Sequence, residues 1–291
     1  MTINCVFFLL KIKYAIFFIL KYFIERRKVL SKKIVITSGK GGVGKTTVTA
    51  NLGRALASLG LSVALVDVDF GLNNLDVVVG VENKLTYDIM DVFEGRCRIK
   101  QALIQDSELK NLYILPSFNV ESSTTLGGQN IKLILDSMSK LFDFILIDCP
   151  AGIDIGFHKA VSCADEAIVV TSPNVTSLRD ANKAISILNS YKLNKVSLIV
   201  NRARGDLIAS EKMILPTDIK DILKINLLGV LPEEDSIFLC SGYPLPKRTE
   251  SYKAYKVLAN NLVNNKDKLY DVTSKYSGFF GSIKRSLRKK I

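Results

Sequence analysis

The sequence predicts an α/β fold: a single doubly wound, mostly parallel sheet with helices on both faces, plus a C-terminal amphipathic helix. Two observations predict it. Strand-like apolar runs alternate with helix-like runs between residues 34 and 264, as in consecutive βαβ units. Several strand-like runs, such as residues 144–147, are apolar without interruption, which is typical of strands covered by helices on both faces.

The elements follow in order along the chain. Strand-like runs are residues 34–38, 62–67, 112–115, 144–148, 167–171, 196–201 and 227–231. Helix-like runs are residues 46–59, 87–93, 129–141, 156–163, 177–191, 216–223 and 252–264. In a doubly wound fold ligands bind at the carboxyl ends of the strands, so the residues directly after each strand are candidates for chemistry.

A glycine-rich loop follows the first strand. Residues 39–47 read Gly-Lys-Gly-Gly-Val-Gly-Lys-Thr-Thr and satisfy G-x-x-x-x-G-K-[ST]. The backbone N–H groups of such a loop surround phosphate oxygens, with Lys45 as a point charge and Thr46 as a Mg²⁺ ligand. A plain glycine turn would need neither residue, so we expect a P-loop NTPase type of fold. The nucleotide-binding candidates in the loop are Gly41, Gly42, Val43, Gly44, Lys45, Thr46 and Thr47.

Acidic residues follow two of the other strands. Asp148 closes the strand-like run 144–148, where a carboxylate beside a phosphate loop is placed to hold Mg²⁺, usually through water. Asp69 is expected to orient a water molecule, and Asp67 is expected to be structural or to support these groups. The alternative for each is a cap or turn residue, since aspartate is common after strands.

Two later loops lie where an adenine ring would bind in this fold. Asn201-Arg202 ends one strand, and Pro232-Glu233-Glu234 follows the next. An asparagine amide can pair with the N6/N7 edge of adenine. Spacing alone leaves a purely structural role open.

Histidine and cysteine usage excludes other chemistry. His158 is the only histidine, so neither a Ser-His-Asp triad nor a histidine metal site can be built, and we assign it no role. Five cysteines, at positions 5, 97, 149, 163 and 240, form no C-x-x-C pair. This pattern favours a reducing compartment and small core residues over zinc or disulfides.

The net charge of +12 is carried by the two ends of the chain. Residues 1–33 hold eight Lys/Arg and one acid, residues 275–291 hold six Lys/Arg and none, and the part between has a net charge of −1. A nucleic-acid-binding domain would spread basic residues over a folded face, so no nucleic acid is expected. Basic ends indicate an anionic membrane surface instead.

The C-terminal residues 278–291 form an amphipathic pattern at helical spacing. This composition predicts a helix that lies in a membrane interface, although a solvated tail or a packed last helix remains possible. Its apolar side is Phe279, Phe280, Ile283, Leu287 and Ile291, and its basic side includes Lys284, Arg285 and Arg288. We expect an ATPase domain at 32–265, a polar spacer at 266–277 and the membrane-targeting helix at 278–291.

Residues 1–31 form an apolar and basic extension. Lys11, Lys13 and Lys21 interrupt it, so no uncharged stretch reaches the roughly 18 residues of a spanning helix. Signal-peptide and transit-peptide features are lacking. A membrane anchor, a poorly ordered extension and a rarely used upstream start remain open.

With these motifs the sequence resembles the MinD/ParA family of deviant Walker A ATPases. Residues 40–47 look like the deviant motif, and residues 67–76 and 148–152 are similar to the switch segments of the MinD branch. Residues 113–116, 164–167 and 229–234 extend the likeness over about residues 33–262, and the C-terminal helix resembles the MinD membrane-targeting tail. The first thirty residues have no counterpart in the family pattern.

The resemblance implies a slow ATP hydrolase that regulates placement of a division site. It implies ATP and Mg²⁺ as cofactors, a homodimer when ATP is bound, an anionic membrane as a surface and MinC-like and MinE-like partners. Lys45 would contact the β/γ-phosphates, Thr46 and Asp148 would organise Mg²⁺, and Lys40 would reach the partner's phosphates. Asp69 would position the attacking water. Asn201, Arg202, Pro232 and Glu234 would hold adenine.

Other classes remain as alternatives: a ParA-like DNA-partitioning ATPase, an Mrp-type iron–sulfur carrier using Cys149, and a nucleotide-binding protein without turnover. The chain has 29 lysines to 11 arginines and 29 isoleucines to 16 alanines, a bias typical of AT-rich coding. This favours a plastid-encoded protein on the inner envelope membrane of a chloroplast. A bacterial cytoplasmic protein on the inner membrane is the alternative.

Overall fold

The computed structural model describes residues 31–70, 74–117 and 126–276. Two compact units divide the chain, Met1–Ser31 and Lys32–Ile291, and all elements described below belong to the second. The N-terminal extension, apart from Ser31, and the amphipathic segment 278–291 lie outside the described residues.

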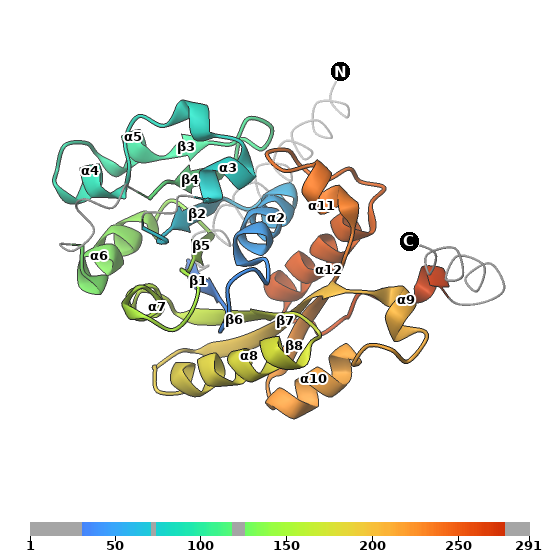
Figure 1. The fold of residues 1–291 in the computed structure, drawn as a ribbon. Helices are drawn as coiled ribbons and strands as arrows, with labels where there is room; N and C mark the ends of the chain where they lie inside the picture. The colour runs from blue at the N-terminus through green and yellow to red at the C-terminus, as the bar shows by residue number, and fades with distance from the viewer. Residues whose placement is uncertain (1–30, 71–73, 118–125, 277–291) are drawn as a thin grey trace, which may run out of the picture. The chain divides into compact units, whose positions relative to one another are not determined.

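One eight-stranded sheet forms the centre of the domain (Figure 1). Its strands are β1 (Lys32–Thr37), β2 (Val63–Asp67), β3 (Ile104–Gln105), β4 (Leu112–Leu115), β5 (Phe144–Asp148), β6 (Glu166–Thr171), β7 (Lys195–Ala203) and β8 (Asn226–Pro232). Their order is β3-β4-β2-β5-β1-β6-β7-β8, and every pair is parallel except β3–β4. The predicted doubly wound, mostly parallel sheet is confirmed.

Helices cover both faces of the sheet and divide the core into two clusters of buried side chains. On one face pack α2 (Lys45–Ser58), α3 (Leu75–Val79) and α12 (Glu250–Asn264); on the other pack α6 (Gly128–Met138), α7 (Ile155–Ser162), α8 (Val175–Leu188) and α10 (Pro216–Leu223). Shorter helices are α4 (Ile89–Phe93), α5 (Ile99–Ala102), α9 (Gly205–Ile208) and α11 (Asp235–Leu239), with 3₁₀ turns at Glu82–Lys84 and Ser274–Tyr276.

The shortest elements were not predicted from the sequence. The two-residue strand β3 and helices such as α5, α9 and α11 are too short to show a hydrophobic period. The predicted helix at 87–93 begins two residues later, because the Asp88 side chain accepts from Met90 N and Asp91 N and caps the first turn.

The helix α2 is packed closely against β2. A methyl group at Gly53 would come within 2.5 Å of Leu65 Cδ2, so a larger residue there would force the helix or the leucine to move. Leu52 and Leu56 on the same helix are fully buried. Because the glycine-rich loop runs directly into α2, this contact fixes the loop relative to the sheet.

Most of the segment predicted as a polar spacer, residues 266–277, packs on the domain. The Tyr270 hydroxyl hydrogen-bonds to the Glu250 carboxylate, and Val272 and Tyr276 are buried. Four apolar or aromatic residues in this polar stretch pack on the domain, a pattern too sparse to see as periodicity: Leu269, Tyr270, Val272 and Tyr276. Within the described residues no helix is long and apolar enough to cross a membrane.

We expect Phe157→Ala to lower the free energy of unfolding by about 3–5 kcal/mol, because the ring is fully buried beneath α7 and its removal leaves a cavity. Urea denaturation measures the loss. Ile155→Ala on the same helix is the matched control, since that side chain is 75% exposed and should change stability by about 0.5 kcal/mol or less. Equal urea midpoints for the two variants would contradict this packing.

Candidate functional site

The glycine-rich loop connects the carboxyl end of β1 to the first turn of α2. Ser38 Oγ donates to Lys40 O at 2.7 Å and fixes the start of the loop. Gly44 has a φ of 95° as the residue before α2, and a Cβ there would lie 2.6 Å from Asn201 Nδ2. Only glycine fits this position, because the conformation is left-handed and the neighbouring strand is close.

The N-terminus of α2 is suited to binding an anion. Among the described residues no side chain caps the helix, and its first turn contains no acid. The free N–H groups and the positive end of the helix dipole therefore face the loop, an arrangement that favours phosphate. Lys45 is buried at this point, whereas Lys40 extends from the loop into solvent.

Asp148 lies beside this helix at the end of β5. It is 2% exposed, and Thr49 Oγ1 donates to its Oδ1 at 3.0 Å. Burial raises the pKa of Asp148 to about 6, although hydrogen bonds from Thr46 and Thr49 and the charge of Lys45 act in the opposite direction. The surroundings of Asp148 offset only part of the cost of ionising its buried carboxylate. Together with a threonine hydroxyl, such a carboxylate suits a hard divalent cation such as Mg²⁺.

Asp67 and Asp69 follow the adjacent strand β2. Asp67 is buried, and it accepts from Asp69 N at 2.8 Å and from Leu75 N at 3.3 Å, so it shapes the loop that leads to α3. Burial and the charge of Asp148 raise the pKa of Asp67 to about 8. The pKa of Asp69 is also raised, because burial outweighs the opposing effect of the positive charge of Lys45. The charge of Lys45 acts on Asp69, and the carboxylate of Asp67 holds the backbone of Asp69.

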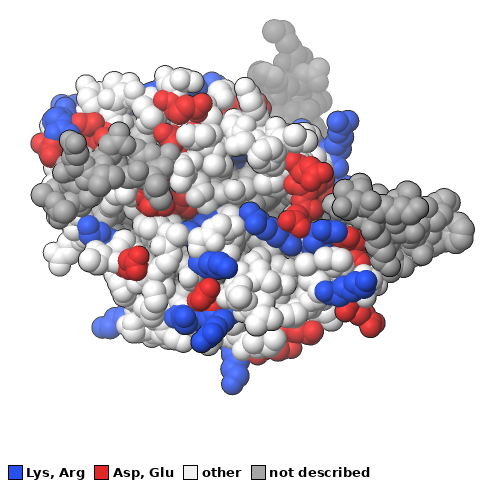
Figure 2. Space-filling model, viewed as in Figure 1, with Lys and Arg blue, Asp and Glu red and all other residues white. Residues whose placement is uncertain are grey.

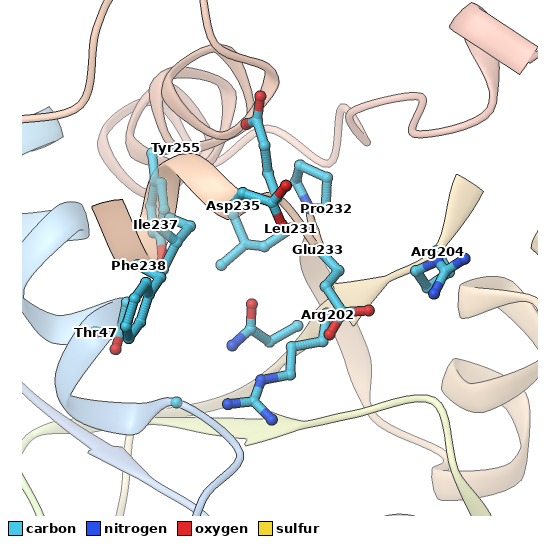
Figure 3. A pocket seen from close by; sticks show the side chains of 13 residues that line it. Thr47, Arg202, Arg204, Leu231, Pro232, Glu233, Asp235, Ile237, Phe238 and Tyr255 are labelled. Atoms are coloured by element: carbon cyan, nitrogen blue, oxygen red, sulfur yellow. The ribbon is translucent and has the colours of Figure 1, made fainter. Parts of the chain in front are cut away.

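Beyond the loop lies a cavity of about 460 Å³ between α2, β7 and β8 (Figure 3). Four of the residues predicted to hold adenine line it: Asn201, Arg202, Pro232 and Glu234. Gly44 and Thr47 line it as well, so the phosphate loop and the cavity form one continuous site.

Asn201 has a partner that the sequence did not suggest. Its Nδ2 donates to Val43 O at 2.8 Å and ties β7 to the glycine-rich loop. One of its two amide hydrogens is therefore not available to a base. The predicted two-point pairing with adenine needs the remaining hydrogen and the amide oxygen.

Glu234 also has partners that the sequence did not suggest. Its carboxylate accepts from Ser251 N at 2.8 Å and from Glu250 N at 3.4 Å, and so caps the N-terminus of α12. Burial would raise the pKa of Glu234, but these hydrogen bonds outweigh it and lower the pKa. Glu234 lines the cavity with its carboxylate already engaged by backbone N–H groups, and its part in holding adenine stays a prediction.

Six cavity residues were not predicted from the sequence: Arg204, Leu231, Asp235, Ile237, Phe238 and Tyr255. Figure 3 shows Phe238 beside Thr47, with Tyr255 entering from α12. Phe238 is 85% exposed and Tyr255 is buried. An aromatic residue three positions after Asp235 was the available signal in the sequence, but a five-residue helix has no period to reveal it.

His158 and the four cysteines among the described residues lie away from the loop or inside the core. His158 is exposed on α7, where its Nδ1 contacts the Tyr191 hydroxyl and the rings stack. Cys97, Cys149 and Cys163 are buried and Cys240 is half-buried. Burial raises the pKa of the Cys149 thiol to about 12, which keeps it protonated near neutral pH.

Comparison with known proteins agrees with this geometry. A family model described as "AAA domain" matches residues 31–201. The chain is 44% identical over 262 residues to the putative septum site-determining protein MinD of the alga Chlorella vulgaris, covering 88% of this chain and 93% of that protein. In structure it is similar to the MinC:MinD cell division protein complex of Aquifex aeolicus, with a TM-score of 0.76, 39% identity and coverage of 82% and 98%. It is also similar to the septum site-determining protein MinD complexed with Mg-ADP from Pyrococcus horikoshii, with a TM-score of 0.72, 33% identity and coverage of 80% and 96%.

We expect the stability of the nucleotide-free, Mg²⁺-free protein to fall between about pH 4 and pH 8. The raised pKa of Asp67 means that the unfolded chain loses this proton first, so folding becomes less favourable as pH rises through this window. A single group gives a slope of at most about 1.4 kcal/mol per pH unit. Asp67→Asn should flatten the dependence, because an amide oxygen still accepts from Leu75 N without ionising. Denaturant unfolding at pH 5 and pH 8 measures it, and an unchanged slope in the variant would refute this assignment.

Proposed function

This chain belongs to the MinD family of septum-site-determining ATPases, and on that basis we propose that it works as a nucleotide-controlled membrane switch. It is an ATPase that uses ATP and Mg²⁺ and regulates where a division site is placed. The observation that carries this proposal is the uncapped N-terminus of α2 inside the glycine-rich loop, with Lys45 and Asp148 beside it. These groups match the charge of a magnesium nucleotide.

In the proposed site, the loop N–H groups and Lys45 bind the phosphates. Thr46 and Asp148 hold the Mg²⁺ ion, which supplies neutralising charge when bound. Asp69 orients the attacking water from the edge of the loop. Asn201 holds Val43 and thereby the loop, and Arg202 and Pro232 contribute to the adenine cavity.

Lys40 serves the dimer rather than its own nucleotide. It is exposed at the tip of the loop, whereas Lys45 in the same loop is buried. We assign Lys40 to the phosphates of a second copy of the chain, so that two copies pair only when ATP is present.

Pairing then controls membrane attachment. A single amphipathic helix binds a bilayer weakly, and stable attachment takes two signals. A dimer brings two C-terminal helices together and raises their effective concentration at the surface. Hydrolysis separates the copies and releases them.

The proposed partners are MinC-like and MinE-like proteins. The Aquifex aeolicus relative forms a complex with MinC, which supports the first, and MinE is inferred from the family alone. Relatives from Chlorella vulgaris and Synechocystis support a plastid or a bacterial cell. Within that choice we propose the inner envelope membrane of a chloroplast, with a bacterial inner membrane as the alternative.

A DNA-partitioning role is the second candidate, since ParA-type proteins share the fold. On the face shown in Figure 2, Lys and Arg side chains alternate with Asp and Glu. No uniform basic stripe for a phosphate backbone is visible on that face. Sedimentation with vesicles or with DNA, each with ATP, separates the two candidates.

We expect Lys40→Ala to abolish the ATP dependence of sedimentation with vesicles of anionic phospholipid, because the cross-dimer contact is lost. Lys220→Ala on α10, also an exposed lysine, is the control and should behave as the unchanged protein. A Lys40→Ala protein that still sediments only with ATP would disprove the cross-dimer role.

We expect Ile283→Glu to abolish vesicle sedimentation while leaving ATP-dependent dimerisation unchanged, since a charge on the apolar side of the tail opposes insertion. Gel filtration with a slowly hydrolysed ATP analogue reports the dimer. Leu133→Glu on α6 is the control, because that leucine is 68% exposed on the folded domain. Unchanged sedimentation of Ile283→Glu would remove the tail from the mechanism.

A further inference from the structure

A second cavity of about 380 Å³ lies between α2, α12 and the connector that joins α11 to α12. Its volume falls at the lower end of the roughly 300–1,000 Å³ typical of small-molecule sites. None of the nucleotide-site residues described above lines it except Tyr255. Tyr255 therefore lines both this cavity and the one predicted to hold adenine.

The walls of this cavity are mainly apolar and fixed in place. Leu109, Leu245, Tyr252 and Tyr255 line it, and Leu245 and Tyr255 are buried. The connector is held by the buried Arg54, whose Nη1 donates to Tyr243 O at 2.8 Å.

Arg54 also joins the connector to the end of α3. Its Nη2 donates to Val79 O at 2.8 Å and to Gly242 O at 3.3 Å. Because one side chain binds backbone oxygens of two separate segments, the cavity is preformed rather than opened by a ligand.

The rim of the cavity carries a positive excess. Lys247 and Lys256 are exposed and line it, against the single carboxylate of Glu108. The charge of Arg54 is offset by buried Asp106, whose Oδ2 lies 3.7 Å from Arg54 Nε. An occupant with an apolar body and one anionic end matches both the walls and the rim.

We propose that this cavity binds a small anionic amphiphile, an acyl carboxylate or an acyl chain with an anionic head. The apolar body lies against Leu109, Leu245 and the two tyrosines, and the anionic end meets Lys247 and Lys256. The site is separate from the nucleotide site, although the two share the Tyr255 wall.

The test is titration calorimetry of the full chain with decanoate below its micellar concentration. We expect saturable binding at one site in the cavity, weakened about tenfold in the Lys247→Glu, Lys256→Glu double variant because two favourable charges are reversed. Ala55→Phe, on the α2 wall, should remove this binding by filling the cavity. Lys220→Glu, outside the cavity, is the matched control.

Decanol distinguishes charge recognition from apolar binding alone: it should bind the unchanged protein more weakly than decanoate does, and the double variant should lose this preference. Nucleotide affinity confirms that Ala55→Phe is folded. Absence of saturable binding, or decanoate binding by Ala55→Phe as tight as in the unchanged protein, would overturn the proposal.

Vesicles of anionic phospholipid identify the source of the amphiphile. Reduced ATP-dependent sedimentation of Ala55→Phe, together with lost decanoate binding, assigns the site to a bilayer lipid. Unchanged sedimentation with lost decanoate binding assigns it to a free acyl carboxylate. Because the decanoate measurement uses no membrane, its failure is distinct from a failure of the proposed membrane switch.

Discussion

The parallel register of the three central strands is the constraint on which the site depends. Asp148 at the end of β5 pairs in register with Ile36 of β1 and with Asp67 of β2. Three chain segments that are far apart in sequence thereby end at one edge of the sheet. The glycine-rich loop, the Asp148 carboxylate and the loop of Asp69 all lie there.

The buried carboxyl groups of Asp67 and Asp148 meet at that edge, and their surroundings offset only part of the cost of ionising them. The pKa values of Asp67 and Asp148 are both raised, chiefly by burial. A protein without a charged ligand gains nothing from this arrangement, because hydrophobic residues would pack there at lower cost. The unfavourable free energy of burying these two carboxyl groups is consistent with a site adapted to a cation and a nucleotide rather than to stability alone.

Residues on β7 and after β8 also support the glycine-rich loop and the cavity next to it. Asn201 on β7 binds Val43 O, and Gly44 lies against the same amide. Glu234 after β8 caps α12, whose Tyr255 lines the cavity that we propose for adenine. Residues predicted as ligand contacts thus also act as supports, because the Nδ2 atom of Asn201 and both carboxylate oxygens of Glu234 are already bonded to backbone.

The sequence by itself determined the fold class, seven of the eight strands, the glycine-rich loop and the acidic residues after β2 and β5. These features are local: apolar runs, helical spacing and a motif whose residues are adjacent in the chain. The tertiary structure alone decided the partners of Asn201 and Glu234, the packing of residues 266–276, the place of Phe238 and Tyr255, and the cavity behind α2. Each of these depends on contacts between segments distant in sequence, such as Val43 with Asn201, and no periodicity or motif records them.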